Sequence, residues 1–146
     1  MSESTPDRFH QIVRKWVKPE DLNQHDALFG GRLLQWVDED AAILAVAQLG
    51  TVDVVTRYMS EVEFVSRADR GDLLELDFGI ENFGRTSITL SCRVENAVTG
   101  QEVLRLERIV FVAVDADGHP VAHGRTEPTP GTERLRERAD DRPGER

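Results

Sequence analysis

Residues whose types can do acid–base chemistry lie close together between positions 21 and 45. An amide side chain, Asn23, is followed by Gly30-Gly31, where a helix should begin, and then by the carboxylate of Asp38. Backbone N–H groups at a helix start have no acceptor within the helix, so they can polarise a carbonyl oxygen. A carboxylate at the edge of an apolar helix face can act as general base on water. The stretch thus offers candidates for a base, a polarised carbonyl and a positioned water.

Each of these residues also has an ordinary structural explanation. A Gly-Gly pair favours a tight turn into a helix, and neither GxxxxGK[ST] nor GxGxxG is present to indicate a phosphate loop. Carboxylates on helix surfaces are usually solvated, and an asparagine in a loop usually forms a turn. Taken singly, Asn23, Gly30-Gly31 and Asp38 leave both explanations open.

A second polar group, Arg85-Thr86-Ser87, follows Gly84. One cation and two hydroxyl groups at a turn could bind a phosphate or an amide. An ordinary polar turn explains the same residues equally well.

The histidines and the single cysteine do not indicate a metal site. No HExxH or CxxC spacing occurs among the four histidines and the single cysteine. Cys92 lies in an alternating apolar pattern, so we expect a small buried side chain rather than a nucleophile. We therefore predict no metal.

One long helix should position Asp38. No proline or glycine interrupts residues 31–48, where leucine and alanine dominate, and Gly50 is expected to end the helix. At about 100° per residue, Asp38 falls at the margin of the apolar face. Asp40 points about 200° away from Asp38, so the two acids cannot serve one pocket.

The rest of the chain is typical of β-strands joined by short turns. Apolar alternation and turn residues predict strands at 9–17, 52–65, 74–80, 88–94 and 103–114. Tight connections favour an antiparallel meander. The sequence predicts an α+β fold, one central helix wrapped by an antiparallel sheet of five or six strands, whose exposed apolar strand faces would require an oligomer.

Composition sets the remaining expectations. The 146 residues suit one domain, which we place at 8–124, and the charged segment 125–146 should be disordered or form a loose helix. The net charge of −9 argues against nucleic acid or an anionic membrane as a partner. The polar start and the lack of a membrane-length apolar run favour the cytoplasm.

Taken together, these motifs resemble the hotdog-fold acyl-CoA thioesterases, in particular the YciA-like and cytosolic acyl-CoA hydrolase group. The resemblance covers roughly residues 10–122 and continues through Val55-Thr56, 84–87 and 111–120. Its most specific part comprises Asn23, Leu28, Phe29, Gly30, Gly31, Leu33, Leu34, Trp36, Asp38 and Glu39.

The resemblance implies hydrolysis of acyl-CoA to a free acid and CoA, with no cofactor because CoA is part of the substrate. Asp38 would act as general base or nucleophile, and Asn23 would position water or substrate. The amides of Gly30 and Gly31 would polarise the thioester carbonyl. The residues around the reacting group or along the CoA path would be Thr56, Arg85, Thr86 and Ser87.

The resemblance also implies dimers assembled into hexamers, with sites between protomers, so Asn23 and Asp38 are expected from different chains. Many members have glycine where Asp26 stands, so the loop around Asp26 is not assured of having the same shape as in those members. Phe29 replaces the histidine of the PaaI-type branch. Two alternatives stay open: a non-catalytic acyl-CoA-binding or sensor module, and a dehydratase that would need His25 paired with an acid.

Overall fold

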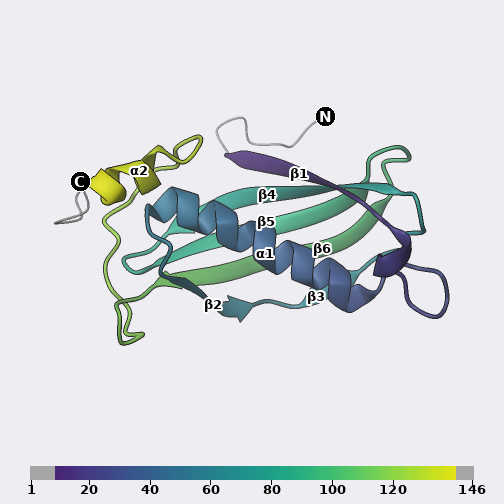
Figure 1. Ribbon diagram of the computed structural model, residues 1–146, viewed down its shortest axis with the longest axis horizontal. Helices are drawn as coiled ribbons and strands as arrows, with labels where there is room; N and C mark the ends of the chain where they lie inside the picture. Colours follow the sequence, from purple (N-terminus) through teal and green to yellow (C-terminus); the bar gives the residue numbers. More distant parts are fainter. Residues whose placement is uncertain (1–8, 141–146) are drawn as a thin grey trace.

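A single long helix, α1 (Gly30–Leu49), lies across one face of an antiparallel sheet (Figure 1). This computed structural model describes residues 9–140. The strands are β1 (His10–Trp16), β2 (Val54–Met59), β3 (Val62–Phe64), β4 (Leu73–Phe83), β5 (Ser87–Asn96) and β6 (Glu102–Ala113). A short 3-10 helix, η1 (Pro19–Asp21), precedes α1, and α2 (Glu133–Asp140) follows the sheet. The predicted α+β class, with one helix and one antiparallel sheet, is confirmed.

The sheet is only partly the predicted meander. Its strand order is β1-β4-β5-β6-β2, with β3 also paired to β6. Strands β4, β5 and β6 do form a meander, but β1 and β2 lie at opposite edges although they are the first two strands in sequence. The connection between them, through η1 and α1, takes the chain from one edge to the other, and the start of α1 already lies beside Phe64 of β3.

The predicted single strand at 52–65 is two strands. β2 pairs with residues 109–113 of β6, whereas β3 pairs with residues 104–106. Between them the Ser60 hydroxyl accepts the Arg108 N–H at 3.0 Å, and the Ser60 N–H donates to the Arg108 carbonyl at 2.9 Å. These bonds replace the regular ladder at the break, which strand alternation alone does not reveal.

The core lies between α1 and the inner face of the sheet. The predicted alternation in β4 and β5 is confirmed, because one parity of each strand is buried. Cys92 is part of this core at 2% exposure, and burial raises the pKa of its thiol. The largest fully buried side chains include Phe78, Phe111, Leu44, Leu74, Leu76, Ile88 and Leu90.

The outer face of the sheet is polar, whereas an exposed apolar face was predicted. Ion pairs cover its outer side, such as His10 with Asp77 and Arg14 with Glu75. Large exposed apolar side chains lie instead on α1 and on the edge strands and the segment after β3: Ile12, Trp16, Ile43, Val55, Tyr58, Phe64 and Val65.

Part of the charged C-terminal segment packs on the end of α1. The buried side chain of Gln48 bonds both the N–H and the carbonyl of Thr129, at 3.0 and 2.6 Å. Arg134 donates to the Gln48 carbonyl at 2.8 Å, where the helix dipole favours a cation. Residues 125–140 are therefore attached through α2, while the rest of the predicted tail, 141–146, lies outside the described residues. No helix within residues 9–140 is long and apolar enough to cross a bilayer.

Candidate active site

The start of α1 leaves two backbone donors available. Phe29 is the N-cap and provides no side-chain cap, while its carbonyl accepts the N–H groups of Arg32 and Leu33 at 3.0 and 3.1 Å. The N–H groups of Gly30 and Gly31 make no hydrogen bond to any residue of 9–140. Since they lie at the positive end of a 20-residue helix, they can bind a carbonyl oxygen on which negative charge develops.

Asp21 fixes the direction in which α1 begins. Its carboxylate is 4% exposed and accepts the Lys18 backbone N–H at 2.9 Å. Arg32, in the first turn of α1, lies 3.4 Å from the same carboxylate. The Asp21 carbonyl accepts the Phe29 N–H at 2.9 Å. These contacts join the loop to the helix start, so they set the position of the two free amides.

Asn23 stabilises the loop with one end of its side chain. Its Oδ1 accepts the N–H groups of His25 and Ala27, at 2.8 and 3.2 Å. Its Nδ2 group bonds no residue in the described part of the chain, so it remains a donor for a ligand. The structure thus gives Asn23 both the turn-forming role and a free amide nitrogen.

Asp26 retains the backbone conformation that glycine would favour. Its φ is 58°, in the left-handed region, and it is the one non-glycine residue of 9–140 with positive φ. Aspartate tolerates this conformation better than most residues because its short side chain can bond locally. The substitution of glycine by Asp26 is therefore compatible with a left-handed turn in this loop.

Asn23 and Gly30 line one cavity of about 300 Å³. Its wall is largely apolar, with Leu28, Leu33 and Val103 beside them. Phe64 from β3 closes one side, and its ring is 3.4 Å from the position that a Cβ on Gly30 would occupy. Gly30 at the helix start therefore adjoins an apolar space of acyl-chain size.

Asp38 is paired with Thr56 rather than with the helix start. The Thr56 hydroxyl donates to Asp38 Oδ1 at 2.9 Å, from exposed strand β2 to the half-buried margin of α1. Asp38 lies eight residues after Gly30, which is about 12 Å along the helix axis. The structure brings Asp38 and Thr56 together and leaves both away from the Gly30-Gly31 amides of the same chain.

The Arg85-Thr86-Ser87 turn lies at the opposite end of α1. It joins β4 to β5, near α2 (Figure 1). A Cβ on Gly84 would lie 2.4 Å from the Ser87 hydroxyl, so any larger residue there would require that hydroxyl group to move. One chain therefore carries the predicted site residues in three separate groups.

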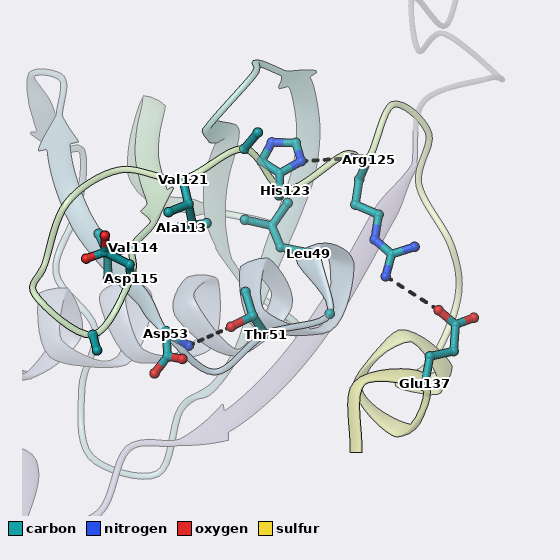
Figure 2. A pocket seen from close by; sticks show the side chains of 13 residues that line it. Leu49, Thr51, Asp53, Ala113, Val114, Asp115, Val121, His123, Arg125 and Glu137 are labelled. Carbon is teal, nitrogen blue, oxygen red and sulfur yellow. Dashed lines mark hydrogen bonds and ion pairs between the residues drawn. The ribbon is translucent and has the colours of Figure 1, made fainter. Parts of the chain in front are cut away.

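Sequence reasoning missed His123, which contacts the 84–87 turn. Its Nε2 is 2.8 Å from the Ser87 carbonyl, and its ring packs edge-on against Phe83. His123 also lines a second cavity, of about 660 Å³, together with Asp53, Asp115 and Glu137 (Figure 2). No local pattern predicts the contact of His123 with Ser87, since the two residues are 36 positions apart in sequence.

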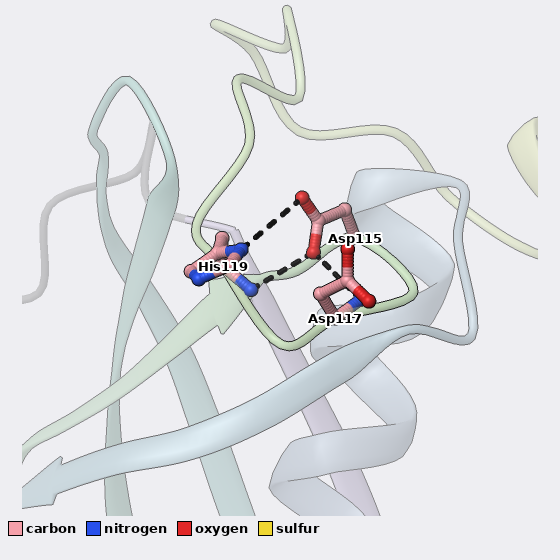
Figure 3. Close-up of side chains that lie close together, drawn as sticks. All are labelled: Asp115, Asp117 and His119. Atoms are coloured by element: carbon pink, nitrogen blue, oxygen red, sulfur yellow. Dashed lines mark hydrogen bonds and ion pairs between the residues drawn. The ribbon is translucent and has the colours of Figure 1, made fainter.

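Asp115, Asp117 and His119 lie close together in an exposed turn after β6 (Figure 3). Asp115 Oδ1 accepts the backbone N–H groups of Asp117 and His119, both at 2.9 Å. These bonds account for the residues as turn formers. The cluster alone does not establish a metal site.

The carboxylate of Asp40 is buried. It is 8% exposed, and its Oδ2 lies 3.6 Å from Lys15 Nζ on β1. Burial raises the pKa of Asp40, and the charge of Lys15 partly opposes this. Asp40 faces β1 and is separate from Asp38, as the helical spacing predicts.

Comparisons with known proteins identify the family. Residues 25–103 match the Thioesterase superfamily. YkhA of Bacillus subtilis, named an uncharacterized acyl-CoA thioester hydrolase, is 32% identical over 115 residues, or 77% of this chain and 66% of YkhA. YciA of Salmonella typhimurium, named an acyl-CoA thioester hydrolase, is 30% identical over 75% of this chain and 86% of its own length.

Solved structures agree with this match. An apo-hexameric acyl-CoA thioesterase superposes with a TM-score of 0.69 at 35% identity, over 90% of this chain and 86% of that one. An acyl-CoA hydrolase from Staphylococcus aureus, solved with butyryl-CoA and CoA, gives a TM-score of 0.68 at 25% identity, over 90% and 84%. The helix-and-sheet arrangement is the predicted hotdog fold. This chain belongs to the thioesterase superfamily.

Proposed function

We propose that this protein hydrolyses acyl-CoA thioesters to a carboxylic acid and CoA, with the reaction centred on Asp38 and the start of α1. The observation that carries the proposal is the pair of unbonded N–H groups at Gly30 and Gly31, of which Gly30 lines an apolar cavity. The names of the two relatives and of the two solved structures support the same substrate class.

The Gly30 and Gly31 amides would bind the thioester carbonyl oxygen. As water adds to the carbonyl carbon, negative charge develops on this oxygen, and fixed donors at a helix start stabilise it. The free Nδ2 of Asn23 lies on the same cavity and would hold the carbonyl oxygen or the acyl group in place. The apolar wall formed by Leu33 and Phe64 would receive the acyl chain.

Asp38 would act as general base. Thr56 donates to its Oδ1, which leaves Oδ2 to accept a proton from water. The water oxygen forms a bond to the carbonyl carbon, and the tetrahedral intermediate then breaks the carbon–sulfur bond. The CoA thiolate leaves and receives the proton, so atoms and charge balance. In the nucleophile alternative Asp38 would instead form an anhydride with the acyl group and release the CoA thiolate. Attack of water on the Asp38 carbonyl of this anhydride would then label Asp38 in a single turnover in ¹⁸O-water.

The site we propose is shared between two chains. The axial offset of about 12 Å separates Asp38 from the Gly30 amides of its own chain. A second chain could place its own helix start against Asp38, along the exposed apolar residues of α1 and β2 such as Ile43 and Val55. One solved relative is described as hexameric. We propose a dimer assembled into a trimer of dimers.

Alanine variants of the Staphylococcus aureus enzyme at one threonine, one aspartate and one asparagine are also among the similar structures. The same three residue types are present here as Thr56, Asp38 and Asn23. The net charge of −9 further supports a protein that binds neither nucleic acid nor membrane, and we propose that it acts in the cytoplasm.

The direct test is turnover of an acyl-CoA chain-length panel, read by a thiol reagent, for the parent and Asp38→Asn. Removal of a general base should lower kcat by about 10²- to 10⁴-fold. Glu39→Gln is the matched control, since Glu39 is exposed on the polar side of α1. Buried Cys92 should not react with the reagent in the folded protein. Equal turnover by Asp38→Asn would remove Asp38 from the mechanism, and binding without any parental turnover would favour the sensor alternative.

A further inference from the structure

Three carbonyl groups at the turn between β4 and β5 are hydrogen-bonded within the protein. The Arg85 carbonyl accepts the His123 N–H at 3.2 Å, and the Thr86 carbonyl accepts the Ala113 N–H at 2.9 Å. The Ser87 carbonyl accepts the Gly84 N–H at 2.9 Å and faces His123 Nε2 at 2.8 Å. Three consecutive acceptors therefore point into the protein, and His123 contacts two of them.

The partners of His123 identify the form of its ring. Nδ1 accepts the Arg125 backbone N–H at 3.0 Å, so it cannot also carry a proton in this arrangement (Figure 2). The proton must then be on Nε2, which donates to the Ser87 carbonyl. The neutral ring therefore joins the segment after β6 to the turn, with Phe83 packed against it.

The opposite side of the turn presents donors. Arg85 is exposed, and the side chains of Arg85 and Thr86 bond no other residue between 9 and 140. With the carbonyl groups turned inward, the guanidinium and the hydroxyl groups can face an anion without repulsion from backbone oxygens. A phosphate group fits this set because guanidinium binds it through two parallel hydrogen bonds.

The adjoining cavity does not suit a phosphate. Its charged lining includes Asp53, Asp115 and Glu137, and its one arginine, Arg125, lies 3.4 Å from Glu137. An anionic ligand is therefore favoured on the Arg85 side of the turn and disfavoured on the cavity side. This places His123 behind the anion-binding surface, where it can orient the turn but does not touch the ligand.

We propose that His123 is a positioning residue for the phosphate-bearing part of the CoA ester, acting through the Ser87 carbonyl. This inference rests on the proposed acyl-CoA hydrolysis. Loss of the Nε2 bond would let the turn rotate and would weaken the Arg85 contact with phosphate. The acyl end of the substrate and Asp38 would be unaffected, so the effect should appear in KM rather than in kcat.

Two amide substitutions separate the two bonds of the ring. In His123→Gln the side-chain N–H₂ can take the place of Nε2 and donate to the Ser87 carbonyl. In His123→Asn the side-chain oxygen can take the place of Nδ1 and keep only the Arg125 contact. We expect about a tenfold higher KM for acyl-CoA in His123→Asn, with kcat within about twofold, and near-parental values in His123→Gln.

An acyl-pantetheine thioester is the matched substrate, because it lacks the nucleotide and its phosphates. The KM for this substrate should be the same in His123→Asn and in the parent. As a control, His119→Asn should leave the KM for both substrates unchanged. An equal rise of KM for both substrates in His123→Asn, or no rise for either, would overturn the proposal. If the His123 variants do not fold, Arg85→Met must raise KM for acyl-CoA alone, and an unchanged KM would be equally decisive against it. Absence of parental turnover on both thioesters would instead refute the proposed function.

Discussion

Thr56 is the one side chain, among the described residues, that the structure places in hydrogen-bond contact with Asp38. Its hydroxyl group orients the carboxylate, so Thr56→Val should lower kcat by about five- to tenfold with little change in KM. Thr56→Ser keeps the hydroxyl group and should retain most of the activity. Steady-state kinetics of both variants on one acyl-CoA measures this. A loss of equal size in Thr56→Ser would show that the methyl group, rather than the hydrogen bond, matters.

Sequence alone gave the residue types of the candidate site but few of their contacts. Asn23, Gly30, Gly31 and Asp38 stood out because a loop, a helix start and a carboxylate lie in one short stretch. The bond from Thr56 to Asp38 is not predictable from periodicity, because it depends on β2 lying beside α1. Such contacts join residues that are distant in sequence, and His123 with Ser87 is a second example.

At the level of elements, regular patterns predicted structure well and irregular ones did not. The alternation of β4 and β5 and the uninterrupted run of α1 gave these elements nearly their observed bounds. The break between β2 and β3 was missed because bonds between Ser60 and Arg108 of β6 create it. The attachment of α2 to α1 was missed for a similar reason: Gln48 binds the backbone of Thr129 and not an apolar partner.

The contact between α1 and β1 leads to a prediction about pH. Burial raises the pKa of Asp40 above its ordinary value, so between the two values the folded state binds more protons than the unfolded state. The free energy of unfolding therefore falls as pH rises from about 4 through the raised pKa. Asp40→Asn has no such dependence, and Lys15 is exposed enough to reach water. The free energy of unfolding of Asp40→Asn minus that of the parent should therefore be larger at neutral pH than at pH 4, by on the order of 1 kcal/mol.

Thermal unfolding of the parent and Asp40→Asn from pH 4 to 8, at one protomer concentration and ionic strength, measures this difference. Glu39→Gln is the control, since its carboxylate is exposed on the same helix and its difference from the parent should stay nearly constant. If the stability of Asp40→Asn relative to the parent instead fell as pH rises, the ion pair with Lys15 would outweigh the cost of burying Asp40.

For the whole molecule, the fold class followed from element types, but the sheet order did not. Short turns correctly joined β4, β5 and β6, whereas nothing in the spacing shows that the connection from β1 to β2 takes the chain to the opposite edge. That crossing puts β2 at an edge and its side chain Thr56 beside α1. It also leaves exposed apolar groups, including Val55 and Tyr58, along the edge where a second chain would complete the proposed site.

Mixing two inactive variants tests whether the site is shared. If Asn23 and Asp38 act together from different chains, a dimer of one Asn23→Ala chain and one Asp38→Asn chain has one intact site and one doubly altered site. Random reassociation makes half of the dimers mixed, so the mixture should regain about a quarter of the parental activity. If both residues act from the same chain, every site in the mixture carries a substitution and no activity returns. Mixing Asp38→Asn with Thr56→Val is the control, because these two residues contact each other within one chain and every combination retains an altered pair.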